Sequence, residues 1–279
     1  MYSVKKQIGD IELFILKDGQ TEFGEETFSG TTSSEINSLL TLNNRKAIET
    51  NFNAFLVKNG NKNILIDAGA GTLFGPAAGN LSKALEEVGM RNDDITDVIA
   101  THLHPDHIGG MVSENGEAVF KNAGLILTKD EHLFWNNADN FKNNINDQKL
   151  PLEVLGAYSD RLNLISGDED IGSGLSAIDL PGHTAGHIGV MISSGNEQFV
   201  IAGDIIHAQY LQINNPDIGV VFDQDLDLAR QSRRRILDIL ATEKIMFSGG
   251  HILSPALGYV LHEGLNYSWV QADLDGIQI

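Results

Sequence analysis

Short apolar runs alternate with polar, glycine-containing turns along the chain, and they predict alternating strands and helices. Residues 11–16 predict a first strand, and the runs 54–57 and 64–66 around Asn59-Gly60-Asn61 predict a hairpin. Further short strands are predicted at 97–100, 124–128, 175–180, 189–192, 198–202 and 245–247. Helical spacing is found at 81–88, 129–140 and 225–241. Because strands precede helices in both halves and no linker or repeat is visible, we expect one α/β domain over residues 1–279.

One long segment departs from this pattern. Residues 20–51 are polar, with a single short apolar group at 36–40 and no clear period. Long segments without periodicity are usually surface excursions or functional covers of a site. We therefore expect residues 20–52 to form a lid or a dimer contact.

Composition narrows the class of protein. The chain has 279 residues, with 19 Lys+Arg against 38 Asp+Glu, a net charge of −19, nine His and no Cys. Without Cys there are no disulfides and no thiolate metal site. The acid surplus argues against nucleic acid and anionic membranes as partners. The N-terminal residues lack a signal-like apolar stretch, and no run approaches a membrane span, so a cytoplasmic protein is expected.

The densest chemical feature is the sequence His102-Leu103-His104-Pro105-Asp106-His107, which directly follows a predicted strand. Pro105 disfavours a regular helix through its middle, so the side chains are expected to splay from a turn. Three inward-facing imidazoles would repel one another if they were protonated. A bound cation would hold them as neutral ligands, so this cluster predicts a metal site.

Three further candidates stand at the ends of predicted strands: His183, Asp204 and His251. A single His in a turn is usually only hydrogen-bonded. These three residues are therefore candidate metal ligands mainly because the chain also contains the cluster at 102–107. Together the candidates provide five His and two Asp, about the number of donors that two divalent ions sharing a carboxylate require. Nitrogen and oxygen donors without sulfur suit zinc first, and also Mn, Fe, Co or Ni.

The cluster and the three later candidates together resemble the pattern of a known family. The cluster at 102–107 is similar to the HxHxDH signature of the metallo-β-lactamase-fold superfamily, and the later candidates follow in the expected order from about residue 53 to 258. The resemblance implies an α/β fold, a four-layer αββα sandwich with metals at one edge of the β-sandwich. It implies a first metal on His102, His104 and His183, a second on Asp106, His107 and His251, and Asp204 as the bridge. Asp67 resembles the family's aspartate that orients a ligand imidazole, and we interpret His187 as a structural hydrogen-bonding residue.

The resemblance also implies a reaction. A hydroxide shared by the two metals would attack an ester-type bond, and one metal would polarise the substrate oxygen. Asp106 is the expected catalytic residue, because it can orient this hydroxide and move a proton to the leaving group. No Rossmann or P-loop glycine pattern is present, so no organic cofactor is expected.

Several departures from the family pattern reduce the number of branches of the superfamily to which the chain could be assigned. Asp204 stands where β-lactamases of the cysteine subclasses carry Cys, and this difference argues against β-lactam hydrolysis as the function. The stretch from 203 to 235 resembles the branch of methyl parathion hydrolase and related aryl-ester or lactone hydrolases. Acyl-homoserine lactonases usually carry Tyr three residues after the bridging Asp, and His207 stands there. The substrate pocket is expected to include Phe134, Trp135 and His207. Phe23 and Phe28 are further candidates.

The predicted function is that of a dinuclear metal-dependent hydrolase of a small neutral ester, lactone or organophosphate triester. A glyoxalase II-like thioester hydrolase and a non-catalytic metal-binding protein stay open as alternatives. The predicted partners are a small-molecule substrate and a second copy in a homodimer, with neither nucleic acid nor membrane. The sequence Arg233-Arg234-Arg235 shares a predicted helix with Asp225, Asp227 and Asp238, so a solvent-exposed, salt-bridged face is expected there.

Overall fold

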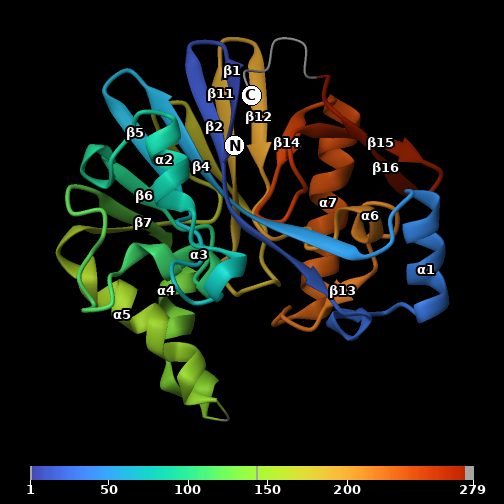
Figure 1. Cartoon of the computed structure of the whole chain (residues 1–279), viewed down its shortest axis with the longest axis horizontal. Coiled ribbons are helices and arrows are strands. Elements are labelled where there is room, and N and C mark those ends of the chain that lie inside the picture. The colour runs from blue at the N-terminus through green and yellow to red at the C-terminus, as the bar shows by residue number, and fades with distance from the viewer. Residues whose placement is uncertain (1, 143, 274–279) are drawn as a thin grey trace.

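Two large mixed sheets pack face to face in the computed structural model, which describes residues 2–142 and 144–273 (Figure 1). The first sheet has the order β1-β2-β4-β5-β6-β7-β8 and the second β16-β15-β14-β12-β11-β10-β9. The strands of the first are β1 (Ser3–Ile8), β2 (Ile11–Phe23), β4 (Ile48–Asn59), β5 (Lys62–Ile66), β6 (Asp97–Ile99), β7 (Gly124–Thr128) and β8 (Leu162–Ile165). Those of the second are β9 (Asp170–Gly172), β10 (Leu175–Asp179), β11 (Ile188–Ser194), β12 (Glu197–Ile201), β14 (Met246–Ser248), β15 (Gly258–Glu263) and β16 (Asn266–Gln271).

Helices cover the outer faces of both sheets. In Figure 1, α2 to α5 lie beside the first sheet and α6 and α7 beside the second. The α-helices are α1 (Ser33–Leu42), α2 (Leu81–Glu87), α3 (Pro105–Ile108), α4 (Lys129–Asn136), α5 (Lys149–Ala157), α6 (Gln209–Gln212) and α7 (Leu226–Glu243). Short 3-10 turns occur at Glu25–Thr27, Gly75–Ala77, Asn92–Asp94, Gly109–Met111, Ala138–Phe141, Ile145–Gln148 and Ser159–Arg161, and a small ribbon pairs β3 (Phe28–Ser29) with β13 (Gly219–Val220). This is the predicted αββα sandwich, and the fold prediction is confirmed. No described helix combines the length and apolar character needed to span a membrane.

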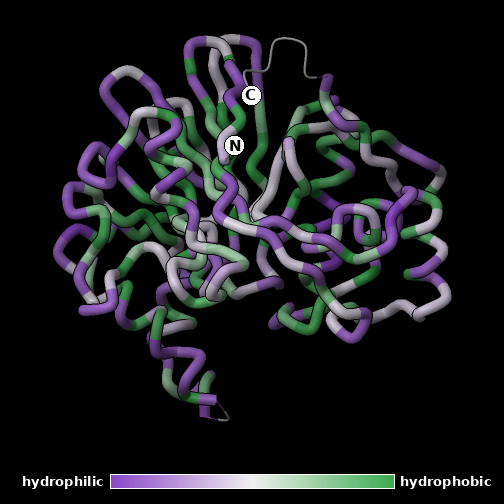
Figure 2. The backbone as a smooth tube through the Cα atoms, in the orientation of Figure 1, coloured by the Kyte–Doolittle hydropathy of each residue, from purple (hydrophilic) through white to green (hydrophobic). Residues whose placement is uncertain are grey.

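Burial explains why these elements form where they do. The inward faces of the two sheets share one apolar cluster that includes Phe55, Ile66, Val190 and Phe199, all fully buried. A second cluster lies between the outer face of the first sheet and helices α2, α4 and α5. Figure 2 shows the same division, with apolar strands inside and polar loops outside. The two-sided burial of these strands accounts for the nearly continuous apolar runs in the sequence.

The segment predicted to lack periodicity is ordered. Strand β2 continues to Phe23, α1 occupies 33–42, and β4 begins at Ile48 and pairs antiparallel with β2. Buried positions of this long hairpin carry polar residues such as Thr50 and Asn51, so a hydrophobicity pattern does not reveal this part of its strands. Its role as a lid or dimer contact stays a prediction.

Pro105 begins a helix that the sequence analysis placed in a turn. It occupies the first position of α3, where the missing N–H costs no hydrogen bond. Asp106 and His107 therefore lie on one helical turn directly after His104.

Arg233 contradicts the expected solvent-exposed face of α7. Its side chain is 1% exposed, and its guanidinium donates to the carbonyl oxygens of Ile205, Pro216 and Ile218. Its Nη2 also lies 3.6 Å from Asp223 Oδ2, and burial lowers the pKa of Arg233 to about 10. Arg234, in contrast, is solvent-exposed, and it pairs at 2.7 Å with Asp217, which lies outside the helix, instead of with the helix carboxylates that were expected. The error arose because charge alone does not show which face of a helix is buried.

Replacing the buried arginine is expected to destabilise the protein far more than replacing its neighbour. Arg233→Ala leaves three buried carbonyls and the Asp223 carboxylate without their partner, so it should cost about 3–5 kcal/mol. Arg234→Ala removes a surface pair and should cost less than about 1 kcal/mol. Chemical denaturation of both variants measures the difference, and equal losses would show that Arg233 is not a structural anchor.

Candidate metal centre

The candidate residues meet at one edge of the sandwich, although they come from four separate parts of the chain. His102 and His104 follow strand β6, and Asp106 and His107 lie on α3 directly after them. His183, Asp204 and His251 follow β10, β12 and β14 of the second sheet. The structure therefore brings together all seven residues that the sequence predicts as metal ligands.

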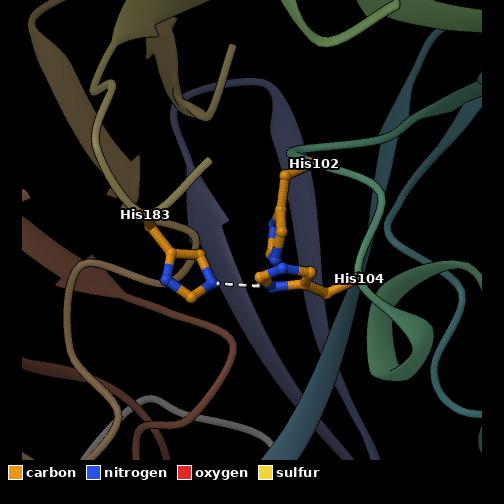
Figure 3. A group of neighbouring side chains, drawn as sticks. All are labelled: His102, His104 and His183. Atoms are coloured by element: carbon orange, nitrogen blue, oxygen red, sulfur yellow. Dashed lines mark hydrogen bonds between the residues drawn. The ribbon is translucent and has the colours of Figure 1, made fainter. Parts of the chain in front are cut away.

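His102, His104 and His183 form a first donor group, here called the three-histidine group. One ring nitrogen of each lies within 4.8 Å of the others. His104 Nδ1 and His183 Nε2 are 2.9 Å apart, the contact drawn as a dashed line in Figure 3. The rings of His102 and His104 meet edge to face, with centroids 4.7 Å apart, so their nitrogens converge on one point between the loops.

Asp106, His107, Asp204 and His251 form a second donor group with the same 4.8 Å spread. Asp204 stands between the two groups. Its Oδ2 lies 3.1 Å from His107 Nε2 and 3.0 Å from His251 Nε2, and also 3.7 Å from His102 and 3.5 Å from His183. One carboxylate therefore faces ligand candidates of both groups, the position that a bridging residue must take.

His207 adds a further imidazole at the same place. Its Nε2 is 3.3 Å from Asp204 Oδ2, and with His183 and Asp204 it forms a third group of converging donors. Its ring stacks on that of His251, with centroids 4.7 Å apart. His207 was predicted only as a residue of the substrate pocket, and it also lies beside the Asp204 carboxylate.

Neighbouring acceptors fix the orientation of these rings. Asp67 Oδ2 accepts from His107 Nδ1 at 2.8 Å, and its carboxylate also accepts from the backbone N–H and hydroxyl of Thr101. His251 Nδ1 donates to the backbone oxygen of Asn51 at 2.8 Å. In each case the Nδ1 contact leaves Nε2 directed at Asp204. Such outer partners hold ligand rings in place in metal sites.

His187 contacts the site without joining either donor group. Its Nδ1 donates to the Leu180 oxygen at 2.8 Å, and its Nε2 accepts from the backbone N–H of Asp204 at 2.9 Å. Both ring nitrogens are used, so His187 holds the loop of Asp204 against the end of β10.

Asp223 escaped the sequence analysis. Its Oδ1 accepts from His183 Nδ1 at 2.9 Å, and its other oxygen accepts from the backbone N–H of Val220. Although burial opposes the charged form, the hydrogen bond from His183 lowers the pKa of Asp223 to about 2. Asp223 lies 40 residues from His183 in sequence. The only sequence signal for Asp223 was its place in the stretch 203–235, which resembles one branch of the family.

The two donor groups differ in charge. Burial lowers the pKa of His102 and His104 well below the usual value, and neighbouring imidazoles add to this effect. Burial also lowers the pKa of His183 to about 4. Burial opposes the charged form of His107 too, but Asp204, Asp106 and Asp67 outweigh it and raise the pKa of His107 well above its usual value. Burial opposes the charged form of Asp204, but the imidazoles around it, His107 and His251 first, hold the pKa of its carboxyl well below the ordinary range.

The donor set fits divalent cations. His102 Nε2 and Asp204 Oδ1 are buried without a hydrogen-bond partner among the described residues, and His102 Nε2 lies 3.7 Å from the other oxygen of Asp204. A buried polar atom without a partner is costly, and ligation would satisfy both atoms. Five imidazoles and two carboxylates without sulfur are ligands that suit zinc and similar ions.

A cavity of about 830 Å³ opens onto this cluster. His104, Asp106, Asp204, His207 and His251 line its floor. Its walls carry seven aromatic side chains: Phe23, Phe52, Phe74, Phe134, Trp135, Phe141 and Phe222. The predicted pocket residues Phe134, Trp135 and His207 all line it, as does Phe23. Phe28 does not, because it packs in a separate core with α1 and α6.

A two-sheet sandwich with converging histidines and a shared aspartate at its edge defines a class of metal-binding α/β proteins. Residues 49–251 match the family model of the metallo-beta-lactamase superfamily, and the chain belongs to this family. The resemblance inferred from the 102–107 cluster is therefore confirmed.

Relatives within the family are metal-dependent hydrolases. An N-acyl homoserine lactonase from Bacillus cereus is 27% identical over 174 residues, and one from Bacillus thuringiensis is 29% identical over 167 residues. These matches cover 62% and 60% of this chain and the same shares of the relatives, so the chain matches less than two thirds of the length of either lactonase.

Solved structures match over nearly the whole chain. AidC, a dizinc quorum-quenching lactonase solved with a product bound, is 32% identical, with a TM-score of 0.89 and 98% of each chain covered. AbOPH, a hydrolase of the beta lactamase superfamily, is 26% identical, with a TM-score of 0.92 and 97% of each chain covered. These likenesses support the lactonase-like branch and the prediction of a hydrolase of ester-type bonds.

Metal binding to the two groups should depend differently on pH. His107 holds a proton near neutral pH, because its pKa is raised, and it must release that proton to bind a cation. The three-histidine group has lowered pKa values and is already neutral. Between about pH 6 and about pH 8, zinc affinity should therefore rise at the second group and stay nearly constant at the three-histidine group. Zinc titrations of His104→Ala, which leaves the second group intact, and of His251→Ala, which leaves the three-histidine group intact, measure this. Equal pH slopes would contradict it.

Proposed function

We propose that this chain is a dinuclear metal-dependent hydrolase of small neutral esters, with hydrophobic lactones as its main substrates. The observation that carries this proposal is the pair of donor groups around Asp204 at the floor of an aromatic cavity of about 830 Å³. The lactonase and hydrolase relatives support the same class of reaction. Organophosphate triesters, which share neutral charge and apolar groups, are a further substrate class of the proposal.

The charge of the cavity supports a neutral substrate. Among the described residues that line it, none is Lys or Arg, whereas Glu22, Asp147 and Asp106 provide carboxylates. An anionic ligand would find no cationic partner on these walls. This composition disfavours the glyoxalase II-like alternative, because a glutathione thioester carries carboxylates that need basic residues to bind them.

The chain's own residues account for the remaining steps. When bound, a pair of divalent cations lowers the pKa of water and polarises a carbonyl oxygen. We propose that the three-histidine group and the group of Asp106, His107 and His251 hold these ions, with Asp204 between them. Opening a lactone adds water across the ring C–O bond, and the leaving alkoxide must gain a proton. Asp106 is placed to transfer that proton, since its side chain is 15% exposed and lines the cavity floor.

His207 is proposed to contact the substrate. It lines the cavity, and its ring lies 6.2 Å from that of Phe222. An imidazole N–H at the cavity floor can donate to an oxygen on which negative charge develops.

Activity should depend on metal and on the neutrality of the substrate. We expect the zinc-loaded protein to hydrolyse acyl homoserine lactones and aryl esters, and chelation should reduce the rate at least about 100-fold, reversibly. A glutathione thioester should be turned over poorly. Asp106→Asn, which removes the proposed proton carrier and also the carboxylate that Asp106 contributes to the second donor group, should lose about 10²–10⁴-fold in kcat when compared at equal bound zinc. Full activity in the metal-free protein would rule out the proposal.

Variants of His207 separate a substrate contact from a ligand. His207→Phe removes the donor and should lower kcat about 10²–10³-fold without loss of bound zinc. His207→Tyr restores a donor of similar reach and should recover most of this loss. Metal analysis and steady-state kinetics on the same samples provide the test, and loss of zinc from His207→Phe would instead make His207 a ligand.

A homodimer and a cytoplasmic location stay predictions. The segment predicted to form a lid or a dimer contact is residues 20–52, which comprises the end of β2, α1 and the start of β4.

A further inference from the structure

Glu131, on the first turn of α4, is a buried carboxylate with no role in the site described so far. Its side chain is fully buried, and desolvation raises its pKa. Thr128 caps the N-terminus of this helix: its hydroxyl accepts from the Glu131 N–H and donates to the Gly186 oxygen at 2.7 Å. A buried carboxylate is costly unless donors surround it, so the position of Glu131 needs an explanation.

Four donors surround this carboxylate, two on each oxygen. Oε1 accepts from the backbone N–H of Leu103 at 3.0 Å and from Trp135 Nε1 at 2.6 Å. Oε2 accepts from the Thr184 hydroxyl at 2.6 Å and from the backbone N–H of Gly186 at 2.9 Å. Each oxygen thus contacts a different loop.

These contacts lie directly behind the three-histidine group. Leu103 is the residue between His102 and His104, and Thr184 is the residue after His183. The two loops belong to different sheets, and no described β-ladder joins β6 to β10. Glu131 is therefore a direct polar link between them, on the side away from the metal donors.

The packing leaves little freedom for an alternative arrangement. A Cβ at Gly186 would lie 2.2 Å from Glu131 N and 2.3 Å from Thr128 Oγ1, so the loop approaches α4 as closely as only glycine allows. Trp135, which donates to the same carboxylate, lies edge-on to His104 with centroids 6.0 Å apart and forms part of the cavity wall.

We propose that Glu131 is a positioning residue that sets the spacing between the His102–His104 loop and the His183 loop, and so preorganises the three-histidine group for metal. It also links this group to the cavity wall through Trp135. The inference rests on the proposed metal-dependent function, but metal binding tests it without any hydrolysis assay. Outer contacts of this kind typically change metal affinity 10–100-fold.

The experiment measures zinc affinity in a His251→Ala background, where the second donor group is incomplete and the three-histidine group is read alone. Glu131→Gln keeps the shape but places an amide N–H₂ against two donors, which releases one of the two loops. Zinc competition with a chromophoric chelator should show affinity roughly 10–100-fold weaker than in the His251→Ala parent. Thr184→Val, a milder change that removes one donor and keeps the carboxylate, should weaken it roughly three- to tenfold.

Asp18→Asn in the same background is the matched control. Asp18 is also fully buried, and its carboxylate accepts from the backbone N–H groups of Ala70, Gly79 and Leu81, none of which belongs to the two loops. It should lose stability but keep zinc affinity within about threefold. The proposal is overturned if Glu131→Gln and Thr184→Val both keep the parent affinity, or if Asp18→Asn loses as much affinity as Glu131→Gln. If lactone hydrolysis is absent while these affinities follow the prediction, the proposed function fails and the positioning role stands.

Discussion

The site depends on one buried carboxylate that five imidazoles surround. Asp204 is 2% exposed, and its Oδ2 lies between 3.0 and 3.7 Å from the nearest nitrogens of His102, His107, His183, His207 and His251. Water cannot compensate charges at such a position, so they must be balanced within the cluster or by bound cations. Among the described residues, Asp204 Oδ1 and His102 Nε2 have no hydrogen-bond partner, so the described side chains do not complete this balance. Cations between the two donor groups would.

The fold serves this arrangement by ending its strands at one edge. Close approach of the loops there requires glycine: a Cβ at Gly250 would lie 2.5 Å from Asp204 Oδ1, and one at Gly203, whose φ is +54°, would lie 2.4 Å from His187 Nε2. Behind the rings, Asp67, Asp223 and Glu131 hold the ligand loops from separate elements. In front of them lies a cavity lined by aromatic and acidic side chains, and the proposal of a neutral, apolar substrate rests on this lining.

Local pattern was enough to predict most strands and the ligand candidates, because short apolar runs mark buried strands and the 102–107 cluster is dense within six residues. Residues that act through long-range contacts were not predictable in this way. Asp223 reaches His183 across 40 residues, and Arg233 is buried only because the 205–218 segment folds over α7. The extension of the β2–β4 hairpin over residues 17–23 and 48–53 was missed, because its buried positions carry polar side chains such as Asn51 and Asn53, whose amides bind carbonyls of the 249–252 loop. Polar burial of this kind is visible only once the partners are in place.

The central claim is that two cations share Asp204, one at each donor group. Anomalous diffraction from zinc-loaded crystals tests it most directly, because the signal locates the ions independently of activity. The account predicts two peaks beside Asp204, one against His102, His104 and His183 and the other against Asp106, His107 and His251. A single peak, or ions bound away from Asp204, would contradict it.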